Sequence, residues 1–250
     1  VLIVLPLKMK FKISRRRFLK IAAASVAGIG IGGTLYSYFL EPYWIAIEQH
    51  TLKFAPKENA PRGLKIVHLS DLHRSEIVPD SYLRECVSKA HDLKPDLIVM
   101  TGDYITSSSK LSDSLGKLLS SLQSSLGVYA TLGNHDGGQW AGFDTLPIKQ
   151  ELEKGGIRVL VNESVELKYR DKPFTVVGLG DLWAEEFDPA QSFSNVKANQ
   201  FTIALSHNPD TINELQKYAA NIILCGHTHG GQVRIPLLGR RLMQILSLQR

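Results

Sequence analysis

Residues 64–73 read LKIVHLSDLH, a hydrophobic run that ends in two residues able to bind a metal ion, Asp71 and His73. A short apolar run rich in β-branched residues is typical of a strand that is buried on both faces. Because side chains alternate along an extended chain, Asp71 and His73 point to the same side. The stretch therefore predicts a buried strand with a polar binding site at its carboxyl end.

The same pattern occurs four more times along the chain. It occurs in residues 96–101 before Gly102-Asp103, in 128–132 before Gly133-Asn134-His135-Asp136, in 201–206 before His207-Asn208, and in 221–225 before Gly226-His227-Thr228-His229. In layered α/β proteins the carboxyl ends of such strands lie along one edge, and ligands bind there. We therefore expect these Asp, Asn and His residues to form one cluster in space.

Helical patterns lie between the expected strands. Residues 80–93, 144–154 and 210–220 carry apolar side chains at helical spacing, and a further helix is predicted to start at Ser109. The apolar face of this last helix would consist of Leu111, Leu115, Leu118 and Leu122.

A further strand pair is expected later in the chain. Residues 165–169 and 174–179 have the composition of adjacent strands, and residues 170–173 would form the turn between them. The alternation of strands and helices predicts an α/β fold of two packed mixed β-sheets flanked by helices.

The basic net charge comes from the amino-terminal end of the chain. The formal net charge is +5, but residues 1–20 hold seven of the 29 Lys and Arg residues and none of the 24 acidic ones. The rest of the chain is therefore slightly acidic, which argues against a nucleic-acid partner. The two cysteines, Cys86 and Cys225, form no CxxC motif, and we interpret them as small core residues.

The amino-terminal segment has the pattern of a targeting sequence. Residues 14–20 read SRRRFLK and precede a charge-free, Ala- and Gly-rich segment at 21–40. This arrangement resembles a twin-arginine export signal, and a plain membrane anchor is the alternative. Twenty residues at about 1.5 Å each are just long enough to span a bilayer as a helix. We expect translation to start at Met9 and the rest of the protein to be exported across the cytoplasmic membrane, either released or tethered to its outer face.

The length and composition suit one sizeable domain plus an appendage. The chain has 250 residues, of which 44% are hydrophobic. We divide it into a leader and apolar segment at residues 1–40, an extended segment and linker at 41–63, and a main domain at 64–250.

The predicted cluster contains more ligands than a single tetrahedral zinc ion can take. Its members are Asp71, His73, Asp103, Asn134, His207, His227 and His229. Two ions that share one carboxylate would use such a set. Two ions roughly 3.5–4 Å apart can hold a bridging hydroxide and clamp a phosphoryl group during in-line displacement. Oxygen and nitrogen ligands without thiolate suit Mn, Fe or Zn.

Taken together and in this order, the five motifs resemble those of the calcineurin-like metallophosphoesterases. The motifs are Asp71-Leu72-His73, Gly102-Asp103, Gly133-Asn134-His135-Asp136, Ser206-His207-Asn208-Pro209 and Gly226-His227-Thr228-His229-Gly230-Gly231-Gln232. The resemblance covers residues 64–234 and implies a four-layer sandwich. With the leader included, the chain is similar to the twin-arginine-exported phosphodiesterase branch of this family.

The resemblance also implies a role for each site residue. One metal would be held by Asp71, His73, Asp103 and His229, and the other by Asp103, Asn134, His207 and His227. Asp103 would bridge the two ions. His135 would face the substrate and protonate the leaving oxygen or stabilise the transition state, and Asp136 would orient its ring.

Three other residues have two possible roles each. Arg74 either contacts a phosphate of the substrate or is a solvated loop residue. Trp140 and Phe143 either line the substrate cleft or anchor the loop after the third motif. A fourth residue, Asp181, also ends a strand, and we expect it to border the site without counting it as a ligand.

The leading hypothesis is a dinuclear metal phosphohydrolase that acts on phosphodiesters or phosphomonoesters. One alternative is the related branch that cleaves the pyrophosphate of UDP-2,3-diacylglucosamine in lipid A synthesis, a cytosolic substrate that an exported domain would not meet. The other is a non-catalytic cell-envelope binding protein on the same scaffold. Relatives usually continue for several strands after the last motif, so we expect the carboxyl-terminal end of this domain, at Arg250, to be truncated.

Overall fold

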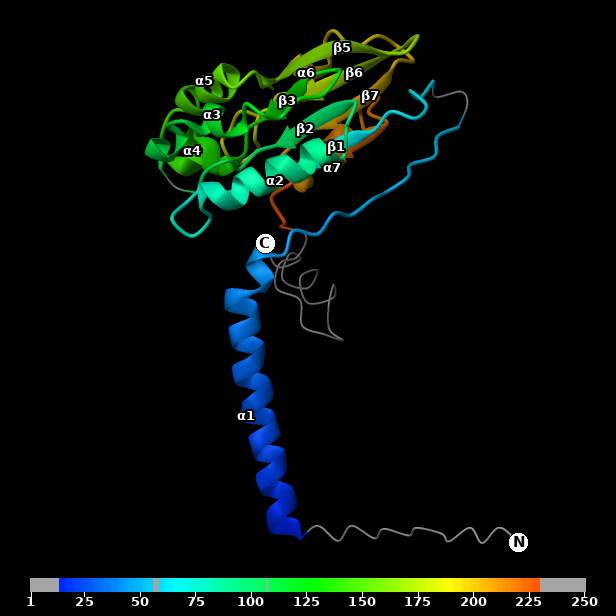
Figure 1. The fold of residues 1–250 in the computed structure, drawn as a ribbon. Helices are drawn as coiled ribbons and strands as arrows, with labels where there is room; N and C mark the ends of the chain where they lie inside the picture. The colour runs from blue at the N-terminus through cyan, green and yellow to red at the C-terminus, as the bar shows by residue number, and fades with distance from the viewer. Residues whose placement is uncertain (1–13, 56–58, 107, 230–250) are drawn as a thin grey trace, which may run out of the picture. The chain divides into compact units, whose positions relative to one another are not determined.

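The computed structural model describes residues 14–55, 59–106 and 108–229 (Figure 1). The chain divides into two compact units, Val1–His50 and Thr51–Arg250. In the first unit, helix α1 (Arg15–Phe39) begins after Ser14, whose Oγ accepts a hydrogen bond from Arg17 N at 3.3 Å. A short 3-10 helix, η1 (Glu41–Tyr43), follows α1.

Helix α1 buries none of its residues. Among the described residues, α1 and η1 form the one helical segment that is long and apolar enough to cross a membrane by length and composition. An apolar helix of 25 residues with no buried residue, near the amino terminus, is consistent with a signal sequence or a membrane anchor.

The second unit contains two four-stranded sheets, and the first of them is parallel throughout. Its strands lie in the order β1 (Ile66–Leu69), β2 (Leu97–Thr101), β3 (Val128–Thr131) and β4 (Arg158–Val159). The register pairs Val67 with Ile98, and Ile98 in turn with Val128. The carboxyl ends of β1, β2 and β3 therefore lie at the same edge of this sheet.

The second sheet is mixed. Its strands lie in the order β5 (Glu163–Tyr169), β6 (Lys172–Gly178), β7 (Phe201–Leu205) and β8 (Ile222–Leu224). Strands β5 and β6 form an antiparallel hairpin, and the other pairs are parallel. Tyr169 pairs with Lys172, so the turn holds only Arg170 and Asp171 and is shorter than expected. The two-sheet α/β fold is confirmed, although only one of the two sheets is mixed.

Short helices flank both sheets. They are α2 (Asp80–Asp92), η3 (Ser109–Ser112), α3 (Leu115–Leu119), η4 (Asn134–Asp136), α4 (Gly138–Ala141), α5 (Leu146–Lys154), α6 (Pro189–Phe193), η5 (Pro209–Thr211) and α7 (Ile212–Leu215). Leu83 of α2, Leu115 of α3 and Leu152 of α5 pack against the first sheet. Leu215 of α7 and Phe193 of α6 pack with Ala204 of the second sheet.

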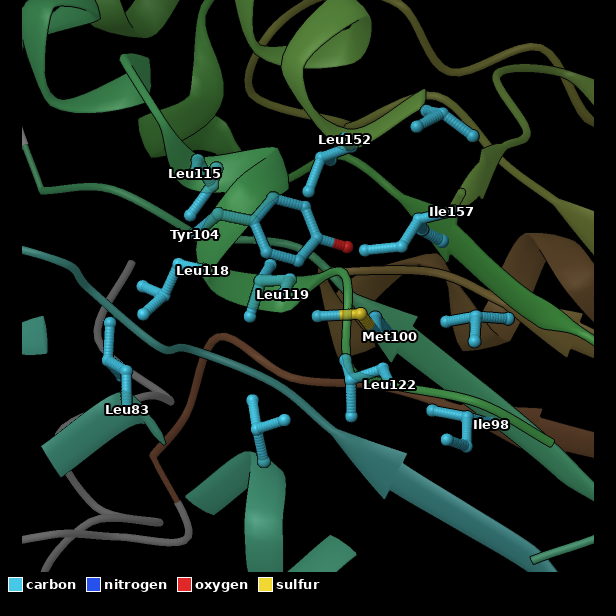
Figure 2. Close-up of a cluster of buried hydrophobic side chains, with 14 of the residues drawn as sticks. Leu83, Ile98, Met100, Tyr104, Leu115, Leu118, Leu119, Leu122, Leu152 and Ile157 are labelled. Carbon is cyan, nitrogen blue, oxygen red and sulfur yellow. The ribbon is translucent and has the colours of Figure 1, made fainter. Parts of the chain in front are cut away.

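Strand β2 shows how the sequence separates the layers. Its alternate residues Leu97 and Val99 belong to the core between the two sheets. Ile98 and Met100 face the helices, where Figure 2 shows them among the leucines of α2, α3 and α5. Strand β2 therefore contributes to two cores, one between the two sheets and one between the first sheet and its helices. The order of the layers is helix, sheet, sheet and helix.

The single helix expected from Ser109 is wrong. The chain forms η3 and then α3, separated by Ser114 in the left-handed conformation at φ 61°. A left-handed residue cannot continue an α-helix, so the helix is interrupted there. Leu115, Leu118 and Leu122 are nevertheless buried in the core. The apolar spacing predicted burial correctly but not a continuous helix.

The helix expected over residues 210–220 is also shorter than predicted. Only Ile212–Leu215 is α-helical, after the 3-10 helix η5. Leu215 is the one buried residue of α7. Short helices are stabilised mainly by packing an apolar face against the protein. A segment with one buried residue has little such packing, so the helix does not extend further.

We predict that Leu152→Ala lowers the free energy of unfolding by about 2–5 kcal/mol, because it leaves a cavity beneath α5. Leu152 is fully buried, whereas Leu146 in the same helix is 50% exposed. The matched variant Leu146→Ala should cost less than about 1 kcal/mol. Urea unfolding of the detergent-solubilised full chain measures both, and equal losses would contradict the assignment of α5 to the core.

Candidate active site

The predicted cluster lies where the carboxyl ends of strands from both sheets come together. Asp71 and His73 follow β1, Asp103 follows β2, and Asn134 opens η4 after β3. From the second sheet, His207 follows β7, and His227 and His229 follow β8. The distances below show that all seven side chains meet.

Many of these residues have an unusual backbone conformation. The site residues with positive φ are Asp71 (54°), His73 (45°), Asp103 (56°), His227 (66°) and His229 (48°). Left-handed backbone is uncommon for residues other than glycine, and such strain is concentrated at functional sites. The loops therefore adopt an uncommon backbone conformation at the residues whose side chains converge in the cluster.

The first group of possible metal ligands consists of Asp71, His73 and His229. The Nε2 atoms of His73 and His229 are 3.1 Å apart, and His229 Nε2 is 3.4 Å from Asp71 Oδ1. The backbone N–H of His227 donates to both oxygens of Asp71, at 2.9 and 3.1 Å. This contact fixes the carboxylate and joins the loop after β1 to the loop after β8.

A second group consists of Asp103, His207 and His227, with Asn134 beside them. His227 Nδ1 lies 3.0 Å from Asn134 Oδ1 and 3.3 Å from His207 Nε2. His207 Nδ1 donates to the carbonyl of Thr101 at 2.7 Å, which orients the ring so that Nε2 faces Asp103 and the candidate metal site.

Asp103 connects the two groups. Its Oδ2 atom lies 3.4 Å from His73 Nε2 and 3.2 Å from His207 Nε2, and the residue is only 2% exposed. Carboxylate oxygens and imidazole nitrogens are ligands that divalent cations bind in proteins, and here they converge on one point. The donor set therefore fits two divalent cations that share the Asp103 carboxylate.

The pKa values of these groups follow from burial and from their neighbours. Burial lowers the pKa of His73 and of His227, which favours the neutral form that binds a metal. Burial acts in the same direction on His207, but the hydrogen bond and negative charge of Asp103 outweigh it and raise the pKa to about 9. His207 in turn holds the pKa of Asp103 below its usual value, although burial opposes this.

His135 lies next to the cluster, as expected. Its backbone N–H donates to Asp103 Oδ1 at 2.9 Å, and its ring is 4.9 Å from the ring of His73. His73, Asp103 and His135 form a third group that could hold a metal ion. The ring Nδ1 of His135 contacts the carbonyl oxygen of Thr106. The geometry is compatible with either ligand or non-ligand behaviour, so the non-ligand role stays a prediction.

Asp136 differs from the expectation that it orients the ring of His135. It is fully buried, and its carboxylate accepts hydrogen bonds from the backbone N–H groups of Asp103, Tyr104 and Gly133 at 2.8–2.9 Å. Burial and the charge of Asp103 raise its pKa to about 7. The carboxylate therefore joins the loops after β2 and β3, and the contact to the His135 ring comes from Thr106 instead.

The guanidinium of Arg74, for which two roles were left open, is bound within the chain. Its Nε donates to Asp80 Oδ1 at 2.7 Å, and its Nη1 donates to the carbonyl of Asp113 at 2.6 Å. A second contact to Asp80 comes from Nη2 at 3.1 Å. The guanidinium thus connects α2 to the chain before α3, and this arrangement does not favour a contact with substrate phosphate.

Two glycines allow the loops to approach each other. A Cβ at Gly133 would overlap with the Asp103 carboxylate, and a Cβ at Gly226 would overlap with Ser70 and lie 2.5 Å from Asp71 Oδ2. Each glycine precedes predicted ligands in the sequence. Its lack of a side chain is what lets the opposite carboxylate come so close.

Asp181 lies beside the site without being counted as a ligand, and sequence reasoning missed Trp183. Asp181 is buried in the loop after β6, and burial raises its pKa. It follows Gly180 at a strand end, the same signal that identified Asp103. The Trp183 ring lies 4.4 Å from the His227 ring. No local pattern in the sequence indicates that contact, because it joins segments that are far apart along the chain.

Comparison with known proteins agrees with this geometry. Residues 64–231 match the calcineurin-like phosphoesterase family. The chain is 38% identical to phosphodiesterase YaeI of Escherichia coli (strain K12), over 91% of this chain and 82% of YaeI. It is 34% identical to the metallophosphoesterase YkuE of Bacillus subtilis (strain 168), over 91% and 81% of the two chains.

A third relative is named for a different activity. The chain is 30% identical to UDP-2,3-diacylglucosamine pyrophosphatase LpxG of Chlamydia muridarum, over 81% of this chain and 74% of LpxG. The extent of these matches shows that the protein belongs to the calcineurin-like metallophosphoesterase family. It is therefore a member of a family of metal-dependent phosphoesterases, and the expected family is confirmed.

We predict that Asp136→Asn weakens metal binding about 10- to 100-fold, because the amide cannot accept all the N–H groups that position Asp103. The free energy of unfolding should fall by about 1–3 kcal/mol. Chelator competition and thermal unfolding of the full chain measure the two effects. The control is Asp171→Asn, at a fully exposed side chain. Normal metal affinity and stability with lost turnover would instead support the original role in orienting His135.

Proposed function

We propose that the protein is a dinuclear metal-dependent phosphodiesterase. The observation that carries the proposal is the position of Asp103 Oδ2 between His73 and His207, each of which comes from a different group of ligands. The similarity to phosphodiesterase YaeI supports a diester as the substrate. The intact donor set and the family argue against a non-catalytic binding protein on this scaffold.

The proposed ligands are the seven residues of the predicted cluster. One cation would be held by Asp71, His73, Asp103 and His229, and the other by Asp103, Asn134, His207 and His227. Mn, Fe and Zn suit these oxygen and nitrogen donors. When bound, the two cations would activate the attacking water for in-line displacement and neutralise charge on the phosphoryl group.

The residues of the chain supply positioning and proton transfer. His207 is fixed by Thr101, and Asp71 by the N–H of His227, so both hold their orientation before substrate binds. His135 is held through its backbone N–H and through the contact of its Nδ1 with Thr106. This leaves Nε2 as the nitrogen that can give a proton to the leaving oxygen.

A second candidate function is hydrolysis of UDP-2,3-diacylglucosamine. The similarity to LpxG favours it, since that protein is a UDP-2,3-diacylglucosamine pyrophosphatase. Both reactions break a bond at a phosphorus atom and can use the same donor set. Direct comparison of the two substrates separates them: faster cleavage of the nucleotide sugar than of a simple diester would favour this candidate.

We also propose that residues 1–40 are a twin-arginine leader, that residues 41–63 connect it to the phosphoesterase domain at 64–250, and that this domain acts outside the cytoplasm. The exposed apolar helix α1 supports a signal or anchor. The consecutive arginines directly before the apolar stretch support export by the twin-arginine machinery.

Two variants separate metal binding from proton transfer. Asp103→Asn should lose both metals, because it weakens the one carboxylate that both ions share. His135→Ala should keep both metals and lower kcat by about 10²- to 10⁴-fold. Metal content per chain and Mn²⁺-dependent hydrolysis of bis(p-nitrophenyl) phosphate are the measurements.

Two outcomes would contradict these assignments. An Asp103→Asn protein with two metals would remove the bridging role, and unchanged turnover in His135→Ala would remove the proton donor. Loss of a metal in His135→Ala would identify His135 as a ligand. Wild-type protein that binds metal but hydrolyses neither diester nor monoester would defeat the proposed function itself.

We predict that Arg15→Lys combined with Arg16→Lys keeps the domain inside the cytoplasm. The double variant conserves charge but leaves no two consecutive arginines, so a plain anchor would still insert. Protease accessibility of the domain in intact cells is the measurement, and Lys10→Arg is the charge-conserving control. Unchanged accessibility in the double variant would support the plain anchor instead.

A further inference from the structure

Two tryptophans lie beside the histidines of the candidate site. The ring centroid of Trp140 is 4.4 Å from that of His135, and the ring centroid of Trp183 is 4.4 Å from that of His227. The two tryptophan rings are 6.4 Å apart and tilted by 36° to each other. They therefore form one aromatic pair that contacts His227 of the predicted cluster and the neighbouring His135.

The backbone holds this pair in place. Gly138 is packed so closely on the loop after β6 that a Cβ there would lie 2.5 Å from Ala184 Cβ. Asp181 Oδ1 accepts hydrogen bonds from the backbone N–H groups of Trp183 and Ala184 at 2.8 and 2.9 Å. Both tryptophans thus come from segments that are fixed to each other, which lowers the entropic cost of binding a ligand.

The exposure of Trp140 distinguishes it from its neighbour Phe143. Trp140 is 50% exposed, whereas Phe143 packs against the core of the first sheet and pairs with Gly138. Phe143 therefore anchors the loop. A single exposed hydrophobic residue is common on proteins. A half-exposed indole beside a second indole and a catalytic histidine offers a flat ring surface next to the reacting group.

We propose that Trp140 and Trp183 bind a planar aromatic group of the phosphate ester and thereby determine which esters the enzyme prefers. The substrate class is an ester that carries a nucleobase or another aryl group close to the phosphorus atom. This proposal rests on the proposed function, because the phosphoryl group must lie at the histidine and aspartate cluster. From there its organic substituent meets the indoles, whose faces favour stacking with a flat ring over contact with a saturated one.

Three phosphonates test the pair without involving a leaving group. Phenylphosphonate, cyclohexylphosphonate and methylphosphonate share the charged head but differ in their organic group. On the Mn²⁺-loaded full chain, phenylphosphonate should inhibit hydrolysis of bis(p-nitrophenyl) phosphate about 3- to 10-fold more tightly than cyclohexylphosphonate. Quenching of tryptophan fluorescence gives the same comparison without turnover.

The variants Trp140→Leu and Trp183→Leu keep an apolar side chain but remove the flat ring. Each should bring the phenyl and cyclohexyl inhibition constants, measured on the same variant, to within about 2-fold of each other. Trp140→Phe should restore part of the preference. Trp44→Leu is the control, since Trp44 is exposed and belongs to the other unit.

The outcomes separate this inference from the proposed function. Equal inhibition by phenylphosphonate and cyclohexylphosphonate in the wild type would overturn the aromatic preference, provided that diester hydrolysis and methylphosphonate inhibition are present. A preference that survives both leucine variants would also overturn it. Absence of metal-dependent hydrolysis of any ester would overturn the proposed function instead.

Discussion

The burial of one carboxylate between histidines from two sheets is the constraint on which the rest of the site depends. Asp103 is almost inaccessible to solvent, yet its side chain faces His73 on one side and His207 on the other. A buried charge is costly unless hydrogen bonds or an opposite charge compensate it. One oxygen has the backbone N–H of His135, and the other lies among imidazole nitrogens. The left-handed loops and the closely packed glycines are consequences of bringing these groups together.

The buried carboxylates of the site have two kinds of partner, histidine side chains and backbone N–H groups. Asp103 faces the histidines, whereas Asp136 accepts backbone N–H groups from the loops after β2 and β3. Asp181 does the same for the loop after β6. Loops have no regular hydrogen-bond ladder, so their buried N–H groups need such acceptors. Three aspartates that look alike in the sequence therefore have different surroundings. Asp103 faces histidines, whereas Asp136 and Asp181 accept hydrogen bonds from the backbone.

The strands and the cluster could be predicted because both depend on local patterns. A run such as residues 97–101 is apolar on both faces, and Asp103 follows it directly. The topology of parallel strands then brings such ends together without further information. The continuous helix from Ser109 could not be predicted correctly, since helical spacing reports which face is buried but not whether Ser114 interrupts the helix. The hydrogen bonds of Asp136 could not be predicted from the sequence either. Its partners are backbone N–H groups, which almost every residue has and which no residue type identifies.

The aromatic pair shows where local patterns stop being informative. Trp140 and Trp183 follow strands of different sheets, β3 and β6, and meet only because the two loops pack at Gly138 and Ala184. The proposed metal ligands follow the strand ends directly, so their positions are fixed by the sheets. The tryptophans are further along the loops, where length and sequence can change without disturbing the cluster. A fold that separates the two in this way can keep one chemistry while the loops select different esters.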